Sequence, residues 1–77
     1  MHLLRIQSGK APKIAFTGIS RKEVIAKIHE MKLQSFHDAY YFEPGHFEKL
    51  GMNGEGSCDY YIIASPDDLA FYENKQF

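Results

Sequence analysis

The chain has 77 residues with one cysteine, 44% hydrophobic and 14% aromatic residues, and a formal net charge of −1. We expect a single domain over residues 1–77, because this length supports one core and the aromatic content argues against disorder. No apolar run approaches the roughly 18 residues of a membrane span, and residues 1–5 lack the apolar segment of a signal peptide. The lone Cys58 fits a reducing compartment, so the expected location is cytoplasmic and no membrane partner is expected.

The near-neutral total conceals two halves of opposite charge. Residues 1–35 carry seven basic and two acidic groups, whereas residues 36–77 carry two basic and eight acidic groups. The halves therefore have formal charges of +5 and −6. All five tyrosines and five of the six phenylalanines also lie in the second half, which is consequently both acidic and aromatic.

The chain begins with the pattern of a β-hairpin. Leu4 and Ile6 alternate with Leu3, Arg5 and Gln7, residues 8–12 supply the glycine and proline of a turn, and residues 13–17 read as the second strand. The side chains expected to point inward are Leu4, Ile6, Ile14 and Phe16. The opposite face then carries Arg5 and Lys13.

A helix is expected directly after this hairpin. Ser20 and Glu23 have the spacing of a capping box, in which a hydroxyl and a carboxylate accept hydrogen bonds from backbone amides at the helix start. The helix is expected to end near residue 33. Its apolar stripe consists of Val24, Ile25, Ile28 and Met31.

Two further strands are expected at 36–43 and 58–64, where aromatic and β-branched residues are frequent. The residues expected to point inward are Phe36, Tyr40 and Phe42 in the first strand and Cys58, Tyr60, Ile62 and Ala64 in the second. The connection over 44–57 is long for so small a domain, which is typical of a functional or mobile loop.

Residues 66–73 are expected to form a short C-terminal helix. Ser65 provides the cap, Pro66 fits the first helical position, and two aspartates follow in the first turn. The order β-β-α-β-β-α predicts a small α+β fold: a mostly antiparallel four-stranded sheet, one long helix packed on one face, and the short C-terminal helix. The pattern leaves open whether the two pairs of strands form one sheet or two.

No motif predicts catalysis or a cofactor. Residues 51–56 are rich in glycine, but their spacing fits neither the dinucleotide-binding motif nor the P-loop, and a strand follows them. His37, His46 and Cys58 are metal-ligand types without the close pair that zinc sites use. A nucleophilic role for Cys58 is disfavoured because the neighbouring charge of Asp59 opposes formation of the thiolate. We therefore expect no enzyme activity, no metal and no cofactor.

Binding to another protein is the favoured function. The residues predicted to make the contact are Tyr41, Glu43, Asn53, Glu55, Asp59 and Tyr61. Tyrosines provide large contact area at low entropic cost, and carboxylates steer a partner that has a basic surface. The opposite charges of the two halves also allow a homodimer. In size and type, the chain resembles the small inhibitors and adaptors that phages and other mobile elements encode against host enzymes.

Binding of single-stranded nucleic acid is the alternative. If both helices lie on one side of a single sheet, the open face carries Arg5, Lys13, Tyr41 and Tyr61, on which bases can stack and phosphates can bind. The sequence pI of about 6.4 is lower than the basic value expected of such a protein. Protein binding is favoured for this reason.

Overall fold

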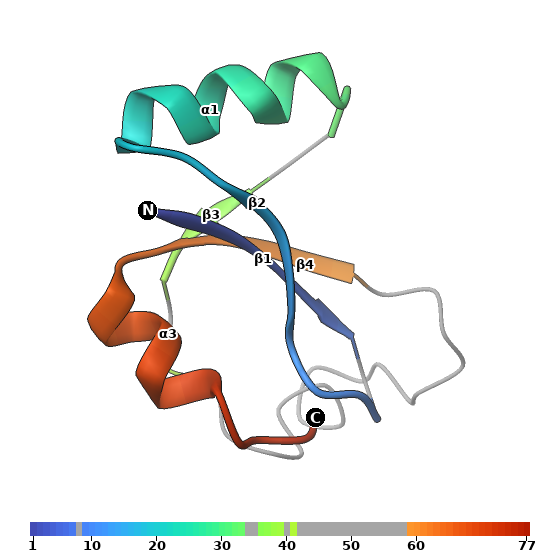
Figure 1. Ribbon diagram of the computed structural model, residues 1–77. Helices are drawn as coiled ribbons and strands as arrows, with labels where there is room; N and C mark the ends of the chain where they lie inside the picture. The colour runs from blue at the N-terminus through green and yellow to red at the C-terminus, as the bar shows by residue number, and fades with distance from the viewer. Residues whose placement is uncertain (8, 34–35, 40, 42–58) are drawn as a thin grey trace.

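The computed structural model describes residues 1–7, 9–33, 36–39, 41 and 59–77. The elements are β1 (His2–Gln7), β2 (Lys13–Thr17), α1 (Arg21–Glu30), β3 (His37–Asp38), β4 (Asp59–Ala64) and α3 (Pro66–Tyr72) (Figure 1). In this part of the chain, one four-stranded sheet carries two helices, which confirms a small α+β fold. Neither described helix has the length and apolar character needed to cross a membrane.

The strands form a single sheet in the order β2-β1-β4-β3. β1 is antiparallel to both β2 and β4, but β3 is parallel to β4. The sheet is therefore mixed, and the prediction of a mostly antiparallel sheet was wrong. A parallel pair needs a crossover connection of about a dozen residues or more, and residues 39–58 between β3 and β4 provide that length.

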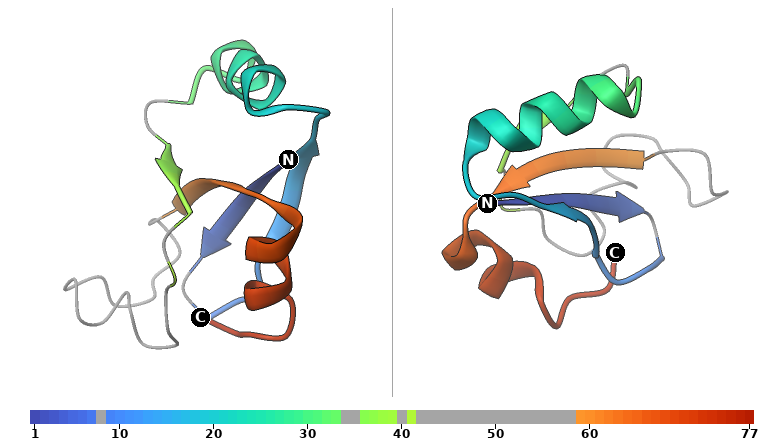
Figure 2. Two further views of the ribbon diagram at one scale, coloured as in Figure 1. Left: turned by 90° about the vertical axis from the view of Figure 1, so that its left-hand side faces the viewer. Right: turned by 45° about the horizontal axis from the view of Figure 1, so that its top comes forward.

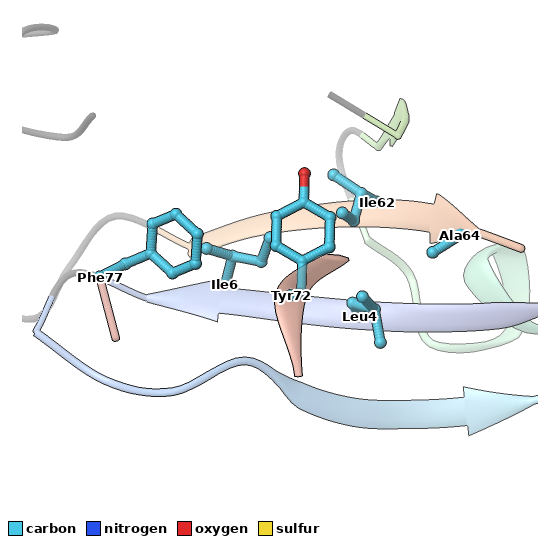
Figure 3. Packing of buried hydrophobic residues seen from close by; sticks show 6 residues of the cluster. All are labelled: Leu4, Ile6, Ile62, Ala64, Tyr72 and Phe77. Atoms are coloured by element: carbon cyan, nitrogen blue, oxygen red, sulfur yellow. The ribbon is translucent and has the colours of Figure 1, made fainter. Parts of the chain in front are cut away.

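The two helices cover opposite faces of the sheet (Figure 2). On one face, Val24 and Ile28 of α1 pack against Leu3 of β1 and Ile63 of β4. On the other face, α3 and the C-terminal residues pack over the same two strands. This second cluster consists of Leu4, Ile6, Ile62, Ala64, Tyr72 and Phe77 (Figure 3).

The prediction of one buried face and one long helix needs correction on both points. Leu3 and Ile63, expected on an outward face, are buried under α1, while their neighbours Leu4 and Ile62 are buried under α3. Strands covered on both faces have runs of consecutive apolar residues, and β1 and β4 both contain such runs. α1 has 10 residues and ends at Glu30, whereas the predicted helix extended to about residue 33.

A β-bulge divides β2 between the two faces. Phe16 lies opposite Leu3, but Ile14 lies opposite Leu4, so Ala15 is the extra residue. Phe16 consequently packs on the α1 side of the sheet, and Ile14 lies on the α3 side with 53% of its surface exposed. The prediction that both side chains point inward on one face was wrong because an extra residue reverses the alternation.

Both helix starts were predicted correctly, although their caps differ. Ser65 and Asp68 form a complete capping box: Asp68 N donates to Ser65 Oγ at 3.2 Å, and Ser65 N donates to Asp68 Oδ2 at 3.0 Å. At α1, the N-cap Ser20 accepts from Glu23 N at 3.4 Å. The Glu23 carboxylate accepts from Ile19 N, one residue before the cap, so the box predicted there is displaced by one residue.

The C-terminal residues return to the first hairpin. Phe77 N donates to Lys10 O at 3.0 Å, and Gln76 Nε2 donates to Gly9 O at 3.1 Å. These bonds place the Phe77 ring against Ile6 and Tyr72 in the cluster under α3 (Figure 3). The buried Tyr72 and Phe77 thus dock this end of the chain against the sheet.

The strand predicted at 36–43 is described only as the two residues of β3, and its inward-facing Tyr40 and Phe42 lie outside the described residues. Phe36 packs against the cluster under α1, as expected for an inward residue. Asp38 is exposed, and its Oδ1 accepts from Arg21 Nε at 3.1 Å and from Arg21 Nη2 at 3.0 Å. This ion pair joins β3 to the start of α1.

Candidate protein-binding site

Of the six residues predicted to contact a partner, the structure describes the side chains of two. These are Tyr41 and Tyr61. Asp59 begins β4 and is described by its backbone alone. Glu43, Asn53 and Glu55 lie outside the described residues, so their part in the contact stays a prediction.

Tyr41 and Tyr61 lie on different sides of the sheet. Tyr61 is half-buried and packs against the cluster under α1. Tyr41 instead contacts Phe71 of α3, which belongs to the cluster on the opposite face. The sheet therefore separates the two tyrosines, and the expectation that both contact a partner stays a prediction.

Tyr41 is held by its ring and its hydroxyl while most of its surface faces solvent. Its Oη donates to Asp68 Oδ1 at 2.6 Å, and its ring meets Phe71 edge-on with centroids 4.7 Å apart and an interplanar angle of 79°. The side chain is nevertheless 61% exposed. An exposed aromatic residue fixed in this way retains area for a partner, because only part of it is used within the fold.

The position of Tyr41 depends on the cap of α3. Asp68 Oδ2 accepts from both the backbone N and the Oγ of Ser65 at 3.0 Å, which leaves Oδ1 for Tyr41. One carboxylate therefore caps the helix and orients the tyrosine. The local sequence Ser-Pro-Asp-Asp explains the cap, but no local signal connects it to Tyr41, which is 27 residues away.

The hydrogen bond also sets the charges of the pair. The pKa of Tyr41 is raised, first because its hydroxyl donates to Asp68 and second because the negative charge of Asp68 disfavours a phenolate. The pKa of Asp68 is lowered because its carboxylate accepts from Tyr41 and then from Ser65 N. At neutral pH the pair is thus a neutral phenol and an ionised carboxylate.

An aromatic row connects this surface to the core. It consists of Tyr41, Phe71, Tyr72 and Phe77, with successive ring centroids 4.7, 5.0 and 5.9 Å apart. The ammonium of Lys75 lies 4.5 Å from the Phe71 ring centroid. Because Tyr72 and Phe77 are buried, the row connects the exposed Tyr41 to the buried cluster under α3.

His37, His46 and Cys58, noted in the sequence as metal-ligand types, are not brought together within the described residues. His37 lies on β3 with its ring centroid 5.6 Å from that of Tyr60, while His46 and Cys58 are outside the described part. Over residues 1–7, 9–33, 36–39, 41 and 59–77, no group of three His, Cys, Asp or Glu side chains is placed to hold a metal ion.

The open sheet face required for stacking nucleic-acid bases is not found in the described structure, because a helix packs on each face. Three of the four residues named for that face are neighbours in one row: Arg5 lies opposite Lys13 on β2 and opposite Tyr61 on β4. Directly opposed residues share a face, so this row lies on the α1 side. Tyr41 is separated from it by the sheet.

Comparisons of the chain with protein-family models, curated proteins and solved structures find no match. Its function therefore has to follow from the chemistry of the described residues.

Proposed function

We propose that the protein is a non-catalytic binding module that contacts a basic protein surface through the Tyr41 patch, defined as Tyr41, Asp67, Asp68 and Phe71. The observation that carries this proposal is the exposed Tyr41 ring, held against α3 by Asp68 and Phe71. Tyrosines at such positions are enriched in the energetic centres of protein interfaces. An inhibitor or adaptor is the kind of protein that works through one such contact.

The charge of the patch favours a cationic partner. Asp67 is exposed in the first turn of α3 and Asp68 keeps its negative charge next to Tyr41, while exposed Glu73 caps the other end of the helix. Complementary charges of this kind raise the rate of association and select against acidic partners. Arginine side chains of a partner would suit the patch best, because guanidinium groups stack on tyrosine and pair with carboxylates.

The patch is also preorganised. The Tyr41 ring and the Asp68 carboxylate each make two kinds of contact within the protein, so binding does not have to order them first. Ordering a rotamer-rich side chain at an interface costs about 0.5–1.5 kcal/mol, and a side chain that is already fixed avoids part of this cost. We expect Glu43, Asn53, Glu55 and Asp59 to add further contacts.

Site-specific photocrosslinking tests this proposal. A photoreactive phenylalanine analogue replaces Tyr41 in one preparation and Ile19 in another, and both are irradiated in lysate of cells that produce the protein. Ile19 is the matched control because it is 92% exposed and lies in the turn before α1. We expect a discrete protein adduct from position 41 that weakens as salt is raised and that is lost with Asp67→Lys.

Three results would contradict the proposal. Adducts formed equally from positions 41 and 19 would show non-specific contact. An adduct that forms unchanged in the Asp67→Lys variant would show that the negative charge of the patch does not contribute to binding. An adduct that ribonuclease or deoxyribonuclease trims to nearly the mass of the free protein would favour the nucleic-acid alternative.

A further inference from the structure

The outer edge of β2 is the second surface with a distinctive chemistry. β2 ends the sheet and pairs with β1 along one edge; among the described residues no strand pairs with its other edge. Every second residue of such a strand directs its N–H and C=O groups away from the sheet. Four of the five residues of β2 are exposed, so these backbone groups are accessible to another chain.

The two sides of this edge differ in chemistry because of the bulge. Lys13 lies opposite Arg5 and Phe16 lies opposite Leu3, so both are on the α1 side. The ammonium of Lys27 lies 5.4 Å from the Phe16 ring centroid, on the same side, where it also pairs with Glu30 at 3.4 Å. The α1 side of β2 is therefore basic.

The α3 side of β2 is apolar where it is most exposed. Ile14 lies opposite Leu4, and 53% of its surface is in contact with solvent. Leu4 is buried under α3, so Ile14 extends the apolar surface of the sheet beyond the area that this helix covers. A strand added to β2 would bury Ile14 on one side and meet Lys13 on the other.

We infer that β2 accepts an extended peptide segment of alternating acidic and apolar residues as a fifth strand. Its backbone would pair with the outer edge of β2, its acidic side chains would lie beside Lys13 and Lys27, and its apolar side chains would cover Ile14. Strand addition of this kind gains affinity from main-chain hydrogen bonds and specificity from alternate side chains. The bulge at Ala15 twists the strand, which suits a short segment better than a long one.

Charge decides between this peptide and a second copy of the protein. Two β2 strands paired about a two-fold axis perpendicular to the sheet would keep the basic side of each copy on the same face. Lys13 and Lys27 of one copy would then lie near the same residues of the other, and like charges across strands are destabilising. Acidic side chains remove this repulsion.

Nuclear magnetic resonance (NMR) titration tests the inference with a defined probe, a synthetic peptide that alternates glutamate and valine. We expect amide shifts centred on residues 13–17 and slower amide hydrogen exchange there. Lys13→Glu and Ile14→Asp should each weaken binding by roughly tenfold, because each removes one side of the recognition. The matched controls Lys22→Glu and Ile19→Asp change exposed residues outside β2 and should leave binding unchanged.

Several outcomes would overturn the inference. Equally tight binding of a peptide that alternates lysine and valine would show that charge plays no part, and shifts centred on α3 would place the site elsewhere. A doubling of particle mass without peptide, reversed by Ile14→Asp, would identify the second copy as the occupant. Tyr41→Ala should leave this titration unchanged, so failure here is distinguishable from failure of the Tyr41 patch.

Discussion

The α1 and α3 sides of the sheet are packed by different kinds of contact. Under α1, the buried residues are the aliphatic Leu3, Val24, Ile28 and Ile63. Under α3, two buried aromatic residues join the aliphatic ones, and hydrogen bonds from Phe77 N and the Gln76 side chain to the first turn close the layer. The α3 side is therefore fixed by directional contacts as well as by apolar burial.

This difference matters for the surfaces that each side presents. On the α3 side, the aromatic row connects Tyr41 to the buried rings by successive contacts. Tyr41 is therefore held in place before a partner binds. On the α1 side, the packing ends at Phe16 and leaves the edge of β2 uncovered by any described strand. One side presents an acidic aromatic patch and the other a basic strand edge.

The largest expected effects come from truncating the two cores. Tyr72→Ala should destabilise the protein by about 3–5 kcal/mol and Ile28→Ala by about 2–5 kcal/mol. Tyr72→Ala should also shift the NMR signals of the Tyr41 ring, because it breaks the aromatic row, whereas Ile28→Ala should not. Chemical denaturation gives the stabilities, and the milder Tyr72→Leu and Ile28→Val serve if either alanine variant is unfolded. Equal changes of the Tyr41 ring signals in both variants would contradict the claim that Tyr41 is coupled to the α3 side and not to the α1 side.

Removing the cap of α3 should destabilise the protein more than removing the cap of α1, although both losses should be smaller than those from the core variants. Ser65→Ala should cost about 0.5–2 kcal/mol, near the upper end because it disrupts the complete capping box. Ser20→Ala should fall near the lower end of that range, since its bond to Glu23 N is 3.4 Å long. Thermal unfolding of the two variants provides the comparison, and a larger loss for Ser20→Ala would contradict it.

The Tyr41–Asp68 pair makes stability depend on pH at both extremes. The folded pKa of Asp68 is lowered, so its contribution is present above the unfolded value of about 4 and is lost as pH falls through the folded pKa. The folded pKa of Tyr41 is raised, so its contribution is present below about 10 and is lost as pH rises through the folded pKa. Tyr41→Phe should remove the alkaline dependence and raise the pKa of Asp68, which an NMR titration of the carboxylate can follow. An unchanged Asp68 titration would mean that the hydrogen bond is not formed in solution.

The smallest expected effect concerns the ion pair between β3 and α1. The side chains of Arg21 and Asp38 are 49% and 73% exposed, so Arg21→Ala should cost only about 0.2–1 kcal/mol. Raising the salt concentration should shrink the difference between wild type and variant, because screening weakens exposed pairs. Unfolding measured at low and high salt checks this, and a loss that is large and independent of salt would indicate that Arg21 packs rather than pairs.

Sequence patterns predicted the element starts because those signals are local. Ser20 and Ser65 each precede a helix, and the turn residues after Gln7 separate β1 from β2. The assignment of faces failed because alternation identifies two faces without saying that both are covered. The bulge at Ala15 has no local signature, and the parallel pairing of β3 with β4 depends on a connection whose path the sequence does not define.

The candidate site was predictable in part for the same reason. Tyr41 follows from composition and its place in the acidic half, and the cap formed by Ser65 and Asp68 follows from spacing. Their meeting depends on tertiary structure, as does the separation of Tyr41 from Tyr61. The sequence shows the members of the aromatic row but not their contacts, because Tyr41 is distant in the chain from Phe71, Tyr72 and Phe77.

The most direct test of the central claim is the affinity of the partner captured at position 41 for two variants, Tyr41→Ala and the control Lys22→Ala, measured by calorimetry. If the Tyr41 patch is the contact, Tyr41→Ala should weaken binding by at least about tenfold, as expected for a residue at the centre of an interface, while Lys22→Ala retains wild-type affinity. Equal affinity of wild type and Tyr41→Ala would contradict the proposed function.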